Sequence, residues 1–101
     1  MIVQIVKFET SLTEDELVAV ANSRLDQYRA TPGLVEKFYC KYAEPNTYGG
    51  VLIWDSMESI KAFGETELAK TIAAAYKVVG QPKVEVLNSM FELRDVMSLA
   101  A

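Results

Sequence analysis

The strands that this sequence predicts are apolar on both faces. The segment Val51-Leu52-Ile53-Trp54 contains no polar residue, and the segments 2–8 and 84–87 come close to the same pattern. An antiparallel sheet with one face in water instead alternates apolar and polar residues along each strand. Because the helices of the chain can cover only one face, this pattern predicts a second apolar face that a partner covers.

A helix is predicted between the first two strands. Thr13 stands three residues before Glu16, which is the spacing of a capping box at a helix start. Apolar residues then recur at the three- and four-residue spacing of one helix face: Leu17, Val20, Ala21, Leu25 and Tyr28. We expect this helix to stop near Thr31-Pro32-Gly33.

A second helical segment is predicted to begin at Ser56, a residue type that favours the N-cap position. We expect the segment to break at Gly64, to restart after Thr66 and to run to Gly80. The apolar residues of its first part, among them Phe63, again follow helical spacing.

The remaining segments predict four strands and one hairpin. The expected strands are 2–8, 34–43, 48–55 and 82–92, with a turn at 44–47 and with Pro82 introducing the last strand. The resulting order, strand, helix, strand, strand, helix, strand, predicts a ferredoxin-like α+β fold with a four-stranded antiparallel sheet. Right-handed crossovers place both helical segments on one sheet face, so two such sheets are expected to pack as a dimeric α+β barrel. We assign residues 1–92 to a single domain and 93–101 to a C-terminal tail.

Composition removes several classes of function. A net charge of −4 without a basic stripe argues against nucleic acid and against anionic lipid as partners. No apolar stretch approaches the length of a membrane span or of a signal peptide's hydrophobic region, and the single cysteine, Cys40, cannot form an internal disulfide. We therefore expect a cytoplasmic protein in which Cys40 behaves as a small, inert hydrophobic residue.

The chain contains no histidine, which removes the commonest general base, metal ligand and haem ligand. Its acidic clusters, Glu14-Asp15-Glu16 and the pair Asp55 and Glu58, lie at helix starts, where capping and the helix dipole explain them. Gly49-Gly50 lies within a hairpin strand and is not a phosphate loop, so we expect it to permit a bulge or close packing. No metal site and no cofactor site is predicted.

Two pairs of polar residues remain open to interpretation. Gln4 and Asn88 interrupt apolar strands that are expected to be neighbours, and they either hydrogen-bond each other across the dimer barrel or point into a pocket. Arg24 and Arg29 either steer an anionic ligand or form solvated helix surface.

The segments Pro32-Gly33-Leu34 and 50–60, with a small-residue helix and a proline-led last strand, resemble a known superfamily. They are similar to the dimeric α+β barrel proteins related to antibiotic biosynthesis monooxygenases, and within these to the YdhR type. The resemblance implies a homodimer with one pocket per subunit between sheet and helices. It also implies, for some members, an oxygen-using reaction on aromatic or polyketide-like molecules without metal or flavin.

The only residue that the resemblance carries over is Trp54, which matches the tryptophan at the end of the third strand. Its indole either forms a pocket wall for a planar substrate or belongs to the core. Tyr28 and Tyr76 lie on the sheet-facing stripes of the helices and are candidate pocket residues, together with Phe63. Tyr39 joins them only if its side of the strand faces the helices. No catalytic residue is identified.

Two functions follow as hypotheses. One is a cofactor-independent monooxygenase-like enzyme that acts on a planar aromatic or polyketide-like small molecule. The other is a non-catalytic dimeric module that binds a small hydrophobic ligand or stabilises another enzyme. A cavity with room for a bicyclic aromatic and with a convergent polar group favours the enzyme, whereas a pocket filled by Trp54, Phe63 and Tyr76 favours the module.

Overall fold

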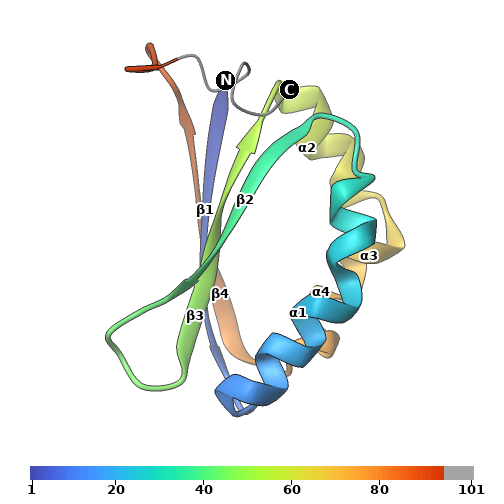
Figure 1. The fold of residues 1–101 in the computed structure, drawn as a ribbon, viewed down its shortest axis with the longest axis vertical. Coiled ribbons are helices and arrows are strands. Elements are labelled where there is room, and N and C mark those ends of the chain that lie inside the picture. Colours follow the sequence, from blue (N-terminus) through green and yellow to red (C-terminus); the bar gives the residue numbers. More distant parts are fainter. Residues whose placement is uncertain (95–101) are drawn as a thin grey trace.

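The helices of the protein lie together on one face of a four-stranded sheet and leave the other face bare (Figure 1). The computed structural model describes residues 1–94. Its elements follow in the order β1 (Ile2–Thr10), α1 (Glu14–Arg29), β2 (Leu34–Lys41), β3 (Thr47–Trp54), α2 (Met57–Gly64), α3 (Glu67–Lys70), α4 (Ile72–Ala75) and β4 (Val78–Asn88). All neighbouring strands are antiparallel, in the sheet order β2-β3-β1-β4, and the predicted ferredoxin-like α+β class is confirmed.

The helix starts use the caps that the sequence predicts. Thr13 Oγ1 accepts a hydrogen bond from the Glu16 amide at 3.2 Å, and Glu16 Oε1 accepts one from the Thr13 amide at 2.9 Å, which completes the capping box. At α2 and α3 the hydroxyl oxygens of Ser56 and Thr66 accept hydrogen bonds from the amides of Ser59 and Ala69, without the reciprocal bond of a capping box. These bonds fix where the helical segments begin relative to the sheet.

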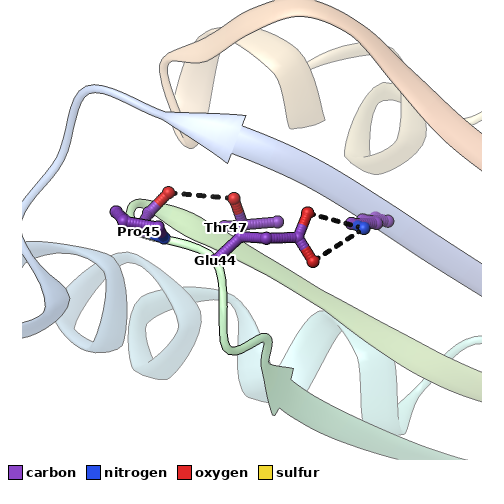
Figure 2. A network of polar contacts seen from close by, with 4 residues as sticks. Glu44, Pro45 and Thr47 are labelled. Carbon is purple, nitrogen blue, oxygen red and sulfur yellow. Dashed lines mark hydrogen bonds and ion pairs between the residues drawn. The ribbon is translucent and has the colours of Figure 1, made fainter.

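A tight turn joins β2 to β3. Asn46 adopts a positive φ of 58°, a conformation that asparagine tolerates better than most residues. Beside it, the carboxylate of Glu44 pairs with Lys7 Nζ on β1, at 2.8 and 3.1 Å, and Thr47 Oγ1 donates to the Pro45 carbonyl at 3.0 Å (Figure 2). The turn is therefore held by a hydrogen bond within it and by an ion pair to β1, one of the two central strands of the sheet.

The last strand begins earlier than its sequence suggests. The expected start at Pro82 is wrong, because β4 already pairs with β1 at Val78, and the second helical segment ends at Ala75 and does not reach Gly80. The register shifts between Lys7 and Glu9 of β1, so Pro82 and Gly80 fall within a bulge of an edge strand. At that place a missing N–H breaks no ladder hydrogen bond, which explains why the strand continues through a proline.

Smaller differences concern the strand ends and one polar pair. The strands β2 and β4 end at Lys41 and Asn88, before the expected ends at 43 and 92. Within the chain Asn88 lies opposite Ile2, and Gln4 Oε1 accepts a hydrogen bond from Trp54 Nε1, so a bond between Gln4 and Asn88 across the dimer barrel stays a prediction. Of the expected tail 93–101, residues 95–101 lie outside the described residues.

The register places even-numbered residues of β1 and β3 on the face that the helices cover. At one end of this face, Ile2, Leu52 and Trp54 form a buried cluster. At the other end, a second cluster is built from Leu12, Leu17, Ala21, Tyr48 and Tyr76. The middle of the covered face lies between these clusters, and its central residue is Gly50. The chain runs continuously in register through Gly50, so this glycine allows close packing and no bulge forms there.

Candidate functional site

A cavity of about 510 Å³ lies between the sheet and the helices, in the middle of the covered face. Gly50 contributes no side chain there, and a Cβ at this position would lie 2.8 Å from the Phe38 carbonyl oxygen. The sheet side of the cavity includes the paired rows Gln4, Leu52, Lys37 and Val6, Gly50, Tyr39. The helix side includes Leu17, Tyr28, Phe63, Ile72 and Tyr76.

Aromatic side chains from α1, α2 and the end of α4 form much of this wall. The rings of Tyr28 and Phe63 lie 5.8 Å apart between centroids, and those of Phe8 and Tyr76 lie 5.7 Å apart, both pairs tilted. Tyr39 also lines the cavity, because it pairs with Gly50 and shares its side of the sheet. Four of the five residues named from the sequence thus surround one space.

Trp54, the fifth, lies behind the wall. It is fully buried in the end cluster and does not line the cavity, while its ring packs against Phe63 with 5.3 Å between centroids. The indole Nε1 donates to Gln4 Oε1 at 3.0 Å. An indole can only donate, so the Gln4 oxygen is its acceptor and the Gln4 amide nitrogen remains as a donor at the cavity wall.

Lys37 is a cavity residue that the sequence reasoning missed. Its Nζ lies 3.5 Å from the ring centroid of Tyr28 and 4.4 Å from that of Tyr39. Such positions over aromatic rings favour the charged ammonium, yet Lys37 makes no ion pair within residues 1–94. Burial, and secondarily the charge of Arg24, lowers the pKa of Lys37 to about 8. The signal in the sequence was the two-residue spacing from Lys37 to Tyr39, which puts both side chains on one strand face.

Tyr28, Tyr39 and Tyr76 remain protonated at neutral pH. Burial raises the pKa of Tyr76 to about 12 and raises the pKa values of Tyr28 and Tyr39 as well. The Tyr76 hydroxyl is buried and has no hydrogen-bond partner within the described chain. It is therefore a hydrogen-bond donor that a ligand in the cavity can use.

The other residues considered from the sequence make contacts within the fold or lie outside the cavity. Arg24 Nη2 donates to the Leu68 carbonyl at 2.5 Å and to Thr71 Oγ1 at 3.1 Å, and Arg29 pairs with Asp26 at 3.0 Å on the surface. Hydrogen bonds from Ser59 and Ser56 lower the pKa of Asp55, in keeping with a capping role. Cys40 lies on β2 opposite Gly49, on the sheet face away from the helices.

Two absences hold for residues 1–94. No three His, Cys, Asp or Glu side chains come together as the ligands of a metal ion would. No helix in this part of the chain has both the length and the apolar composition that crossing a membrane requires.

Comparison with solved structures places this fold among oxygenase structures. A proposed antibiotic biosynthesis monooxygenase from Caulobacter crescentus CB15 superposes with a TM-score of 0.77 at 20% identity, over 89% of this chain and 90% of that one. SnoaB, a cofactor-independent oxygenase from Streptomyces nogalater, gives 0.75 at 12% identity over 93% and 97%. The monooxygenase ActVA-Orf6 from Streptomyces coelicolor, solved with the ligand nanaomycin D, gives 0.73 at 18% identity over 93% and 91%.

The fold of the chain is therefore that of the antibiotic biosynthesis monooxygenase structures. No protein-family model matches the sequence, and no curated protein matches it. The narrower likeness to YdhR-type proteins stays a prediction.

Proposed function

We propose that the protein is a monooxygenase-like enzyme that oxidises a planar aromatic or polyketide-like small molecule without a bound cofactor. The observation that carries this proposal is the cavity, which combines aromatic walls with the polar groups of Gln4, Lys37 and Tyr76. Its volume of about 510 Å³ falls in the range of small-molecule sites and has room for a bicyclic aromatic. The names of SnoaB and ActVA-Orf6 as oxygenases, and the nanaomycin D bound to the latter, support the same substrate class.

In the proposed reaction the substrate itself supplies the electrons. A phenol loses its hydroxyl proton, and the electron-rich ring carbon forms a bond to dioxygen and loses its hydrogen. The O–O bond then breaks, one oxygen atom stays on the ring as a quinone carbonyl, and the other leaves as water. Phenol and dioxygen thus give quinone and water, with atoms and electrons balanced.

Different side chains have different parts in this proposal. Tyr28, Tyr39, Phe63 and Tyr76 form the walls that hold the planar ring. Trp54 is a positioning residue, because its hydrogen bond sets the direction of the Gln4 amide and its ring supports Phe63. The buried Tyr76 hydroxyl donates to an oxygen atom of the substrate.

The bare face of the sheet is proposed to bind a second copy of the chain. Apolar residues occupy its centre, including Ile5, Val51 and Ile53, and Phe38 is 55% exposed. Burying several hundred square ångströms of such surface at roughly 25 cal/mol per Å² stabilises a dimer by on the order of 10 kcal/mol before association costs. Two sheets closed on each other form the dimeric α+β barrel.

One observation favours the alternative of a non-catalytic binding module. Among the described residues, the only carboxylate that lines the cavity is Glu14, which pairs with Lys41 at 2.7 Å. A module of this kind binds the same planar ligands and consumes no oxygen.

The test combines binding with oxygen uptake. Thermal shift against planar phenols and naphthohydroquinones identifies a ligand, because a ligand specific for the folded state stabilises it by mass action. Enzyme-dependent oxygen consumption and quinone formation with that ligand are expected. Stabilisation without oxygen uptake would establish the binding module, and no stabilisation by any planar aromatic would overturn both functions.

Two neighbouring alanines of α4 supply a matched control. Ala73 lines the cavity and Ala74 does not. Ala73→Phe is therefore expected to abolish ligand stabilisation and oxygen uptake, and Ala74→Phe is expected to retain both. Equal behaviour of the two variants would place the reaction elsewhere on the molecule.

A further inference from the structure

We propose that Lys37 accepts the hydroxyl proton of a phenolic ligand and holds the resulting oxyanion, so that the cavity selects aromatic molecules that carry an ionisable hydroxyl group. This inference rests on the proposed function in one respect, since it takes the ligand to be a planar aromatic in the cavity of about 510 Å³. It adds the residue that binds the reacting oxygen and the ionisation state in which the ligand is held.

The strand register aligns Lys37 with a second donor. Leu52 of β3 pairs with Lys37 of β2 on one side and with Gln4 of β1 on the other, and all three line the cavity. The backbones at Lys37 and Gln4 lie two strand spacings apart, or about 10 Å. A ring lying over Leu52 therefore meets the amine at one edge and the Gln4 amide nitrogen, oriented by Trp54, at the other.

The surroundings of Lys37 lack the anion that a buried lysine normally pairs with. Its Nζ stands between the rings of Tyr28 and Tyr39, at 3.5 and 4.4 Å from their centroids. The titratable and charged groups that face it or line the same cavity are Arg24, Tyr28 and Glu14 from α1, Lys70 from α3, Tyr76, Tyr48 from β3, and Tyr39, Cys40 and Lys41 from its own strand. Glu14 is paired with Lys41, so a bound oxyanion supplies the missing negative charge.

Two features of the site favour proton transfer from a phenol to the free amine of Lys37. Burial and Arg24 bring the pKa of Lys37 down to about 8, so the free amine is accessible. A phenol such as a tyrosine side chain has a pKa of about 10 in water, and the adjacent ammonium stabilises its ionised form. Where Lys37 is the free amine, the phenol O–H bond breaks on binding and an N–H bond forms on Nζ; where Lys37 is already an ammonium, the phenol proton passes to the solvent. Both routes leave a phenolate oxygen opposite an ammonium. No oxidant or reductant takes part.

This proton balance dictates how affinity depends on pH. The complex contains one proton shared between lysine and ligand. Below the pKa of Lys37, binding a neutral phenol releases a proton, so affinity rises about tenfold per pH unit. Between about pH 8 and the pKa of the phenol no net proton moves and affinity is level. Above the ligand's pKa affinity falls.

The experiment uses the full chain with 2-naphthol, whose neutral and ionised forms differ in absorbance and fluorescence, and with 2-methoxynaphthalene, which cannot ionise. At pH 8 the bound 2-naphthol is expected to show the spectrum of the naphtholate. Lys37→Met is expected to weaken 2-naphthol binding on the order of tenfold to a hundredfold, as for a lost charged hydrogen bond. Its binding of 2-methoxynaphthalene is expected to change little. The control is Lys61→Met, which alters an exposed lysine of α2 outside the cavity.

Lys37→Arg separates proton acceptance from simple charge attraction. Arginine stays protonated, so in this variant affinity is expected to keep rising up to the pKa of the naphthol, whereas in the unaltered protein the rise ends near pH 8. A bound naphthol with the spectrum of the neutral form, or affinity that is independent of pH in the unaltered protein, would overturn the inference. These two measurements need no variant, so a failure of Lys37→Met to fold leaves the test intact.

The outcomes also separate this inference from the proposed function. Naphtholate bound at Lys37 without oxygen uptake supports the inference and refutes the oxygenase. Oxygen uptake that survives in Lys37→Met, together with a neutral bound naphthol, refutes the inference and leaves the oxygenase standing.

Discussion

Two adjacent residues of β2 show how differently the two faces of the sheet are built. Lys37 points into the covered face, between two tyrosine rings, while Phe38 is 55% exposed on the bare face. In a sheet with one face in water the charged residue would lie outside and the phenylalanine inside. The inversion supports the proposal of a polar or anionic ligand inside and of a second copy of the chain on the bare face.

The largest predicted effect concerns the bare face. Val51→Asp is expected to weaken dimer formation by more than a hundredfold, because it buries an unpaired carboxylate at the centre of the interface. Sedimentation at micromolar concentration would measure the change. Met57→Asp is the matched control, since Met57 is a partly exposed apolar residue at the start of α2, on the other side of the sheet. If the unaltered protein sedimented as a monomer, the bare face would have no second copy of the chain as its partner.

The fold was predictable because its local signals agree with its packing. Local signals mark the elements: the Thr13 capping box and the Ser56 cap mark helix starts, and the apolar pattern marks the strands. The order of these elements along the chain then predicts the ferredoxin-like architecture. The start of β4 was not predictable from Pro82, because the meaning of a proline depends on whether its strand is an edge strand. Edge position is a property of the whole sheet and cannot be read from a local segment.

The site was predictable in part for a related reason. Helical periodicity identifies Tyr28 as sheet-facing, since one stripe of the helix must be buried. The spacing of Lys37 and Tyr39 puts them on one strand face but does not say which face, because a register shift between Leu34 and Glu36 makes Leu34 and Lys37 face the same side despite their odd spacing. A bulge of this kind leaves no clear mark in a single sequence.

The second prediction concerns the packed end of the covered face. Trp54→Phe is expected to lower the free energy of unfolding by about 1–3 kcal/mol, since it leaves a void and removes the donor to Gln4 Oε1. Urea unfolding would measure this change. Gln4→Met in the Trp54→Phe background is expected to cost less than in the unaltered protein, because the two side chains are coupled. Additive effects of the two substitutions would show that the hydrogen bond contributes nothing.

The third prediction concerns the buried amine of Lys37 on the covered face. Lys37→Met is expected to raise the free energy of unfolding at pH 7 by on the order of 1–2 kcal/mol after allowance for solvent screening. The pKa of Lys37 is lowered from 10.5 to about 8, so between these values the unfolded state binds more protons and the unaltered protein gains stability as pH rises. The advantage of the variant should therefore be full below pH 8 and should shrink towards pH 10.5. Urea unfolding at several pH values measures it, and a constant difference would contradict the burial of this amine.

The smallest predicted effect belongs to Tyr76. Its hydroxyl is buried without a partner within the described residues, so Tyr76→Phe removes an unsatisfied polar group and is expected to raise the free energy of unfolding by up to about 1 kcal/mol. The same change is expected to weaken a bound phenol several-fold, because the ligand loses a donor. Tyr42→Phe, which alters a tyrosine outside the cavity, serves as the control. A stability gain with unaltered ligand affinity would show that the hydroxyl is a packing defect, whereas a gain in stability with a loss of affinity identifies a polar group kept inside the fold for a ligand.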